Sequence, residues 1–421
     1  MWLLPASARW GAVALLFAAF CASLALAPGD AARPASKPQN EFVVGAILDL
    51  AGGWTSLGRA SRVTLRLATA DANAALARRD APLRVRLRVL DARGEPALAL
   101  HQLRRLARSG VRIVVGPQKS SEVARRAATS LGILVISQGS TAHSLAIASD
   151  NVFRFVPDDL REGEAVVALL RHDGIDAIVP VWRRDAGNAG LASSVRRKFA
   201  AADGKVSQGV PYATKATPFN RVASSISGQA ISLRSAGAKH VGVYLAGFDE
   251  IVDLFHAARS DSTLQVPWYG SDGVALTTRL VDDQSAAAFA HSVGYPNPTV
   301  GLSDSLVRRA GPLLTRARKR LGRDPDALAL TAYDALRIAV EARQHAGASG
   351  GPRLRRALVA AANAHVGVTG RMTLNRAGDR AFGNFDFWSV CPLGAKFHWV
   401  RSFVYAARHV GSGQILPRTH C

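Results

Sequence analysis

The strongest constraint on the fold is a repeated alternation of short apolar runs and segments with helical spacing. The first run, residues 42–50 (FVVGAILDL), ends one residue before a glycine pair, and residues 59–76 follow with apolar side chains at helical intervals. A short, continuous apolar run that stops near glycines is typical of a strand buried on both faces of a parallel sheet. The alternation therefore predicts an α/β fold in which helices connect parallel strands.

The same unit recurs along most of the chain. We expect further strands at residues 83–90, 111–115, 133–136, 177–181, 239–245 and 266–269, and helices at residues 96–109, 121–131, 189–202, 223–235 and 250–258. The length of 421 residues exceeds one ordinary domain and fits two lobes of roughly 150–200 residues each. Ligands bind to such sheets at the carboxyl ends of the strands, so the loops that follow the strands are the first candidates for a site.

The N-terminal segment predicts export from the cytoplasm. Arg9 precedes an apolar run over residues 10–26, and Ala25-Leu26-Ala27 has the pattern of a signal-peptidase site. We therefore expect residues 1–27 to be a cleavable signal peptide and residues 28–40 to be a polar linker. A retained membrane anchor is the alternative, because the apolar run approaches the ~18 residues that span a bilayer.

The cysteines support the same compartment. Once the signal peptide is removed, Cys391 and Cys421 are the two cysteines that remain. An even pair in an oxidising compartment favours a disulfide, which would hold the C-terminal end of the chain. Two free thiols are the alternative.

The net charge can arise in two ways. The chain carries 53 Lys and Arg against 31 Asp and Glu, for a formal charge of +22. An excess of this size suggests an anionic partner. However, 45 of the 53 basic residues are Arg and they are spread along the chain, as a compositional bias would also produce. Export argues against a nucleic-acid partner, which leaves an anionic ligand or anionic lipid head groups.

Three loops in the first half of the chain offer hydroxyls and backbone amides. They follow predicted strands at residues 52–58, 116–121 and 137–141, and each precedes or approaches a predicted helix. Hydroxyls and free N–H groups at the start of a helix suit a carboxylate or another anion. For any one loop taken alone, plain helix capping is the better explanation. Three such loops after neighbouring strands favour a binding site.

Motifs for catalysis are missing from the sequence. It contains no zinc-protease, P-loop or dinucleotide-binding motif, and its histidines lack metal-ligand spacing. One G-x-S-x-G pattern occurs at residues 347–351, but a predicted helix precedes it and Pro352 follows it directly. A nucleophile elbow needs a strand before the serine and a helix after it. We therefore expect no enzymatic activity, no metal and no cofactor.

The order of several segments resembles one family, the type I periplasmic binding proteins of the Leu/Ile/Val-binding type. These are the extracytoplasmic receptors of branched-chain amino acid ABC importers. No single segment is specific, but their order and spacing match from about Glu41 to Val400. The segments that carry the resemblance are residues 43–53, 114–121, 136–141, 152–159, 243–248, 268–273 and 378–388.

The resemblance implies two Rossmann-like lobes with parallel sheets, joined by three hinge crossings. The crossings would fall near residues 154–157, near Val293 and near residues 370–381. Lobe 1 would then contain residues 41–155 and 294–380, lobe 2 would contain residues 156–293 and 381–400, and residues 401–421 would form a C-terminal tail.

In lobe 1, the resemblance assigns ligand contacts to three loops. The serine that receives a ligand carboxylate is matched by Ser120 or Ser121, and the alignment is ambiguous by one residue. The loop that supplies backbone groups and a hydroxyl is matched by Gly139-Ser140-Thr141. Leu57 stands where leucine receptors carry an aromatic side chain, and Trp54 lies close enough in sequence to replace it.

In lobe 2, the resemblance assigns an acid and an aromatic residue. Asp272 matches the acidic residue that binds the α-ammonium group, and Phe248 matches the aromatic residue that closes over the ligand. Helix capping for Asp272 and lobe packing for Phe248 are the alternatives. Ala186 stands where the family often carries a tyrosine, which implies a roomier or more polar pocket and puts a branched aliphatic ligand in doubt.

The function implied is that of a solute-binding subunit of an ABC importer. It would be a monomer in the periplasm, would capture an amino acid or a related small carboxylate, and would dock on a permease in the inner membrane. A ligand-sensing module of the same fold, for an amide, urea or a metabolite, is the alternative.

Overall fold

The structure, a computed structural model, describes residues 40–51, 54–117, 121–213, 218–302, 304–407 and 409–418. The predicted signal peptide lies outside the described residues, as does all of the predicted linker except Asn40. Within the described ranges, no helix combines the length and apolar character that crossing a membrane requires.

The first sheet has six strands, all parallel, in the order β14-β5-β4-β3-β1-β2. Its central strands are almost completely buried, which accounts for their continuous apolar sequences. The α/β prediction is therefore confirmed. The strands are β1 (Asn40–Leu48), β2 (Leu83–Asp91), β3 (Ile113–Val115), β4 (Leu134–Ser137), β5 (Val152–Pro157) and β14 (Asp379–Arg380).

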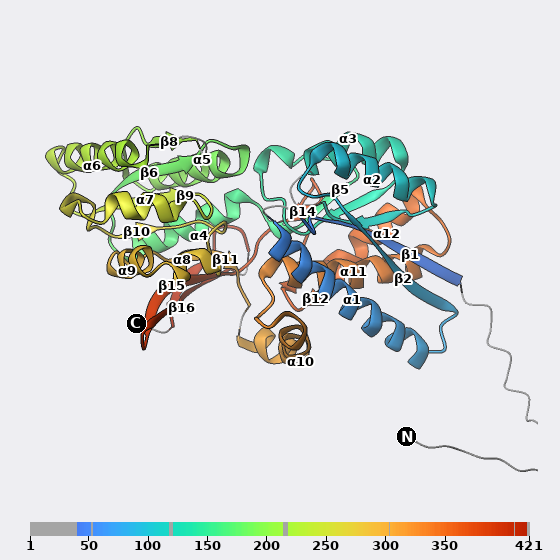
Figure 1. Cartoon of the computed structure of the whole chain (residues 1–421). Coiled ribbons are helices and arrows are strands. Elements are labelled where there is room, and N and C mark those ends of the chain that lie inside the picture. Colours follow the sequence, from blue (N-terminus) through green and yellow to red (C-terminus); the bar gives the residue numbers. More distant parts are fainter. Residues whose placement is uncertain are drawn as a thin grey trace, which may run out of the picture. The chain divides into compact units, whose positions relative to one another are not determined.

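Helices cover both faces of this sheet (Figure 1). α2 (Pro96–Arg108) and α3 (Ser121–Leu131) pack on one face. On the other face lie α1 (Thr55–Arg78), α11 (Ala327–Ala346) and α12 (Gly351–Ala364). The G-x-S-x-G pattern runs from the end of α11 to Gly351, the first residue of α12, so its serine follows a helix and not a strand.

The second sheet is also parallel, with the order β10-β9-β6-β7 and with β8 paired to β6. α4 (Asp159–His172) and α5 (Ala186–Ala201) pack on one face, and α6 (Phe219–Ser235), α7 (Ile251–Ala258) and α9 (Gln284–Ser292) pack on the other. α8 (Thr278–Asp282) precedes α9. The strands are β6 (Ala177–Arg183), β7 (Lys205–Val206), β8 (Val210–Tyr212), β9 (Val241–Ala246) and β10 (Trp268–Tyr269).

A four-stranded antiparallel sheet was not foreseen from the sequence. Its order is β11-β15-β16-β17, with β11 (Asn297–Val300), β15 (Phe385–Leu393), β16 (Lys396–Ala406) and β17 (Gln414–Pro417). β15 and β16 are joined by a tight turn in which Gly394 adopts a positive φ of 62°. The segment expected as a tail after Val400 thus contains the second half of β16 and all of β17. A two-stranded pair, β12 (Val366–Gly367) with β13 (Gly370–Arg371), completes the strands of the described residues.

The chain passes three times between the two parallel sheets. It passes first between β5 and α4, then between β11 and α10 (Asp304–Leu321), and last between β14 and β15. Because β11 pairs with β15, the second passage comes after Val300, later than the expected position at Val293. From here on, lobe 1 denotes residues 40–157 and 301–380, and lobe 2 denotes residues 158–300 and 381–418.

Candidate ligand-binding site

The loop after β4 is hydrogen-bonded to Ser137, the last residue of β4. The Ser137 hydroxyl accepts a hydrogen bond from the Ser140 backbone N–H at 3.1 Å and donates to the Pro117 carbonyl at 3.3 Å. Ser140 is buried, whereas Gly139 and Thr141 are partly exposed. The structure therefore brings together two of the three predicted loops, those after β3 and β4.

The two predicted aromatic residues meet across the lobes. Trp54 precedes the first turn of α1, and Phe248 follows β9 in lobe 2. Their ring centroids are 5.9 Å apart in an edge-to-face arrangement, and the Arg183 guanidinium carbon lies 5.0 Å from the Phe248 centroid. Leu57 lies in the first turn of α1 and is partly exposed.

For three predicted site residues, the structure gives little or no support for a place in the site. Ser120 lies outside the described residues. Ser121 is the first residue of α3, but its side chain is also outside the described part. Ala186 is exposed at the first position of α5, next to Asp185, which caps the helix by accepting the Asn188 N–H at 3.0 Å.

An acidic cluster in lobe 2 faces the β4 loop. Asp272 follows β10, is partly exposed, and donates its backbone N–H to Glu162 Oε1 at 3.1 Å. Glu162 and Asp159 lie in the first turn of α4 and are buried. The Asp159 backbone N–H donates to the Thr141 carbonyl at 3.0 Å. Asp272 and the Thr141 loop, both predicted from the sequence, are thus connected through the start of α4.

Burial dominates the electrostatics of this cluster. It raises the pKa of Asp159 to about 7, with the Thr141 hydroxyl acting in the opposite direction and Asp272 adding to the rise. Burial also raises the pKa of Asp272 to about 6, and it raises the pKa of Glu162 well above its usual value, with Asp272 and Asp159 contributing. Three carboxyl groups that lie this close together and are this poorly solvated favour a positively charged group beside them.

Several polar atoms around the cluster have no hydrogen-bond partner within the described residues. The Tyr244 hydroxyl and the Ser271 hydroxyl are among them. In the described part of the chain, neither carboxylate oxygen of Asp159 has a partner at hydrogen-bond distance, although the Thr141 hydroxyl lies near enough to lower the pKa of Asp159. Gly190 of α5 leaves room beside Asp159, because a Cβ atom at this position would lie 2.8 Å from Oδ2. Buried polar groups normally find partners, so this region has unused capacity for hydrogen bonding.

Asp159 and Glu162 were not predicted as site residues from the sequence. Acidic residues in the first turn of a helix are favoured by the helix dipole on any helix, so they gave no distinct signal. What distinguishes these two is their burial against Asp272 and Tyr244, which depends on the tertiary fold.

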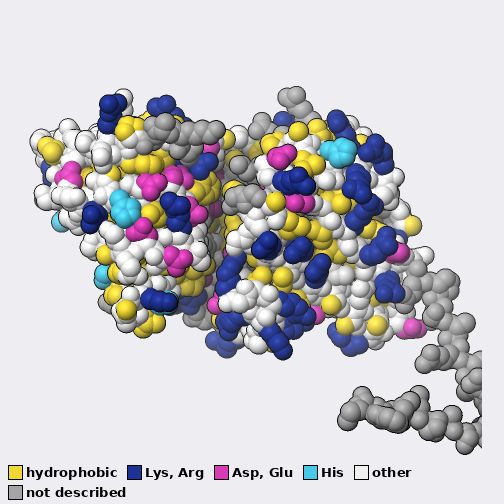
Figure 2. All heavy atoms as spheres, viewed as in Figure 1, with side chains coloured by type: hydrophobic (Ala, Val, Ile, Leu, Met, Phe, Trp, Pro, Cys, Tyr) yellow, Lys and Arg dark blue, Asp and Glu magenta, His cyan; other side chains and the backbone are white. Residues whose placement is uncertain are grey.

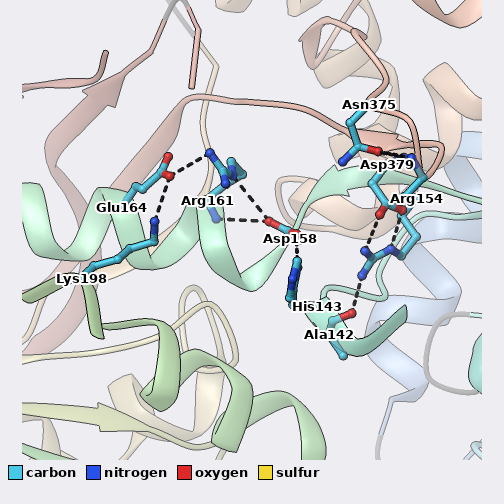
Figure 3. A network of polar contacts seen from close by, with 10 residues as sticks. Ala142, His143, Arg154, Asp158, Arg161, Glu164, Lys198, Asn375 and Asp379 are labelled. Carbon is cyan, nitrogen blue, oxygen red and sulfur yellow. Dashed lines mark hydrogen bonds and ion pairs between the residues drawn. The ribbon is translucent and has the colours of Figure 1, made fainter. Parts of the chain in front are cut away.

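A network of polar contacts holds the start of α4 in place (Figure 3). Arg154 of β5 binds both carboxylate oxygens of Asp379 of β14 at 2.6 Å and donates to the Ala142 carbonyl at 2.5 Å. The next residue, His143, contacts Asp158 at 3.0 Å, and Asp158 caps α4. The Arg154–Asp379 pair is almost fully buried, so removing one partner would cost about 3–5 kcal/mol.

The described residues show no cluster of three or more His, Cys, Asp or Glu side chains suited to a metal ion. Cys391 is buried in β15 and is disulfide-bonded. Cys421 lies outside the described residues, so its pairing with Cys391 stays a prediction, to be checked by peptide mapping with and without reductant.

These features define a class: a two-lobed α/β protein in which each lobe contains a parallel sheet with helices on both faces. A family model described as a periplasmic binding protein matches residues 41–390. The chain therefore belongs to the periplasmic binding protein family, as the resemblance implied. The family and the solved neighbours below are solute-binding proteins and not enzymes.

Several known proteins are similar to this chain over most of its length. The uncharacterized protein MJ1266 of Methanocaldococcus jannaschii is 25% identical over 409 residues, which cover 92% of this chain and 95% of that protein. LivJ of Streptococcus pneumoniae, a branched-chain amino acid transporter substrate-binding protein solved with isoleucine, has a TM-score of 0.69 at 18% identity and covers 90% of this chain and 100% of its own.

A second solved structure has the same fold with a different ligand. The ABC transporter solute-binding protein of R. palustris, solved with benzoate, has a TM-score of 0.66 at 19% identity and covers 88% of this chain and 99% of its own. At these identities the likeness establishes the fold and leaves the ligand to be argued from this chain's own residues.

Proposed function

We propose that this chain is the extracytoplasmic solute-binding subunit of an ABC importer and that it captures an amino acid. The observation that carries the proposal is the connection of the Thr141 loop, through the buried start of α4, to the carboxyl groups around Asp272. The Thr141 loop offers a hydroxyl and backbone groups, and the carboxyl groups around Asp272 offer negative charge.

A zwitterionic ligand fits both sides. Its carboxylate would take hydrogen bonds from the Thr141 hydroxyl and from the start of α3 at Ser120 or Ser121, since free N–H groups at a helix start attract anions. Its ammonium group would face Asp272. A ligand that carries only a carboxylate would leave the acidic cluster without a positive partner, at a cost in affinity.

The aromatic pair would cover the ligand's side chain. Trp54 and Phe248 come from different lobes and already lie in contact, so hinge opening would separate them and hinge closure would return them over a bound molecule. Ala186, in place of a tyrosine, would leave space for a side chain larger or more polar than leucine.

The remaining parts of the proposal concern location and partners. The signal peptide at residues 1–27 would export the chain to the periplasm, where it would act as a monomer. The closed, loaded form would dock on a permease in the inner membrane.

A thermal-shift screen of the purified mature protein tests the proposal. The screen should contain aliphatic, aromatic and polar amino acids, together with benzoate, amides and urea. A ligand at 100 times its Kd should stabilise the protein by about 2.7 kcal/mol. We expect the shift from an amino acid; a shift from urea or benzoate alone, or from no solute, contradicts the proposal.

A further inference from the structure

The positive charge of the chain lies almost entirely in lobe 1. Lobe 1 holds 32 Lys and Arg against 14 Asp and Glu, whereas lobe 2, of similar length, holds 18 against 16. The formal charges are therefore +18 and +2. A bias in composition acts on the whole chain and would give both lobes a similar excess of basic residues. The asymmetry indicates that the basic residues of lobe 1 have a role of their own.

The charge is concentrated where α10 packs on α1. α10 buries Leu313 and Ala317 against Leu67 of α1, which leaves its polar side turned to solvent. Figure 2 shows Lys and Arg side chains gathered over this part of the molecule. We call this surface the basic face; its exposed members are Arg59, Arg66, Arg308, Arg309, Arg318, Lys319 and Arg320.

Few acidic groups neutralise the basic face. Arg318 pairs with Asp324 at 2.7 Å, and Arg316 beside it pairs with Asp71 at 2.6 Å. Among the described residues, no ion pair involves five members of the face, namely Arg59, Arg66, Arg308, Arg309 and Lys319. Their charges are available to an outside partner.

The shape of the surface decides between anionic partners. A small anion needs a concave site with buried donors, but these side chains are exposed along the outer sides of two helices. An extended array of phosphates matches many separate, exposed cations much better. We propose that the basic face of lobe 1 binds the surface of an anionic phospholipid bilayer.

This contact is electrostatic and peripheral. The described side chains of α1 and α10 include no exposed large apolar residue for insertion apart from Val307, which is 36% exposed. Each Lys or Arg near an anionic bilayer adds to the attraction, which falls off within a Debye length of about 10 Å at 0.1 M salt. The contact would hold the protein near the membrane.

Co-sedimentation with vesicles tests this proposal independently of any ligand. The vesicles contain 40 mol% phosphatidylglycerol in phosphatidylcholine (~0.1 M NaCl), with pure phosphatidylcholine as the reference. The variant changes Arg59, Arg66, Arg308, Arg309 and Lys319 to Gln. We expect the mature protein to bind the anionic vesicles alone, and the variant to bind them at least ~tenfold more weakly. Salt at ~0.5 M should release the protein.

A matched control separates the basic face from net charge. It changes five exposed basic residues of lobe 2 to Gln, namely Arg171, Arg221, Arg234, Lys239 and Arg259, and so removes the same charge. The control should bind like the unchanged protein, and both variants should melt within about 2 °C of it because surface changes cost little. Equal weakening by both variants, no binding to anionic vesicles, or binding to heparin or DNA without binding to vesicles would overturn the proposal.

Discussion

The two sides of the candidate site differ in chemistry. Lobe 1 contributes neutral groups, namely the Thr141 hydroxyl and the backbone of the β4 loop. Lobe 2 contributes the buried carboxyl groups of Asp159 and Glu162 and the partly exposed carboxyl group of Asp272. A site with these two halves suits a ligand with a hydrogen-bond-accepting end and a positive end. The difference therefore argues for a zwitterion more strongly than the fold does, because neighbours of the same fold hold both isoleucine and benzoate.

Removing the charge at Asp272 should have the largest effect. Asp272→Asn keeps the size of the side chain but removes the negative charge that, in the proposed complex, would face the ammonium group. A hydrogen bond to a charged group contributes about 1.5–3 kcal/mol, so affinity for the amino acid should fall by ~10–150-fold in calorimetry. Asp249→Asn, an exposed change in the same lobe, is the control and should bind normally. Equal affinity in the two variants would remove Asp272 from the site.

Removing the hydroxyl at Thr141 should have a smaller effect, on the other end of the ligand. Thr141→Ala should weaken binding of the amino acid about tenfold, because a hydrogen bond from a hydroxyl to the ligand carboxylate contributes about 1.5 kcal/mol, the lower end of the range for bonds to charged groups. Thr141→Ser should restore most of the affinity, and Thr129→Ala at an exposed position should change nothing. A Thr141→Ala variant with full affinity would mean that lobe 1 holds the ligand through other groups.

The pH dependence should differ in sign between binding and stability. The pKa values of Asp272 and Asp159, about 6 and 7, lie above their ordinary value, so raising the pH from 5 to 8 ionises both and should tighten amino acid binding severalfold. For the same reason, these groups stabilise the ligand-free fold fully only below about pH 4, and their contribution to the free energy of unfolding is lost as the pH rises through about 6 and 7.

Calorimetry and urea unfolding at several pH values, with and without ligand, check both signs. Asp272→Asn should flatten the binding profile. Binding that weakens as the pH rises would contradict the proposal that the ligand's ammonium group lies at the acidic cluster.

A methyl group at Gly190 should have the smallest effect. Gly190→Ala places a Cβ atom near Asp159 Oδ2 and should push the carboxyl group aside, reducing affinity about two- to threefold while leaving the protein folded. Gly228→Ala is the matched control, since this helical position has open space around it and alanine should raise stability by about 0.5–1 kcal/mol. Unchanged affinity in the Gly190 variant would show that binding does not depend on the position of the Asp159 carboxyl group.

The fold was largely predictable because its strands are buried on both faces. β1 and β9 are continuous apolar runs, a pattern that few elements other than buried strands produce, and each was predicted within a few residues. The antiparallel sheet was not predicted, because β15 and β16 follow the last helix of the alternating series and mix polar with apolar residues. The turn at Gly394 was the available signal.

Residues of the candidate site could be predicted only where they lie in loops whose sequence is itself distinctive. The β4 loop and Asp272 were predicted, and the structure connects them through the start of α4. The buried acids Asp159 and Glu162 were missed because their sequence context is that of any helix start. Likewise, the total charge follows from counting residues, but its division between lobes required knowing where the chain crosses.

The most direct test compares three forms of one molecule. Isothermal titration would measure the Kd of the amino acid found in the screen, of the same molecule without its amino group, and of the same molecule without its carboxylate. We predict that each truncated form binds at least ~tenfold more weakly than the complete amino acid, because each leaves one half of the site without its partner. Equal affinity for the form without the amino group would contradict the zwitterion account and would mean that the acidic cluster of lobe 2 does not contact the ligand.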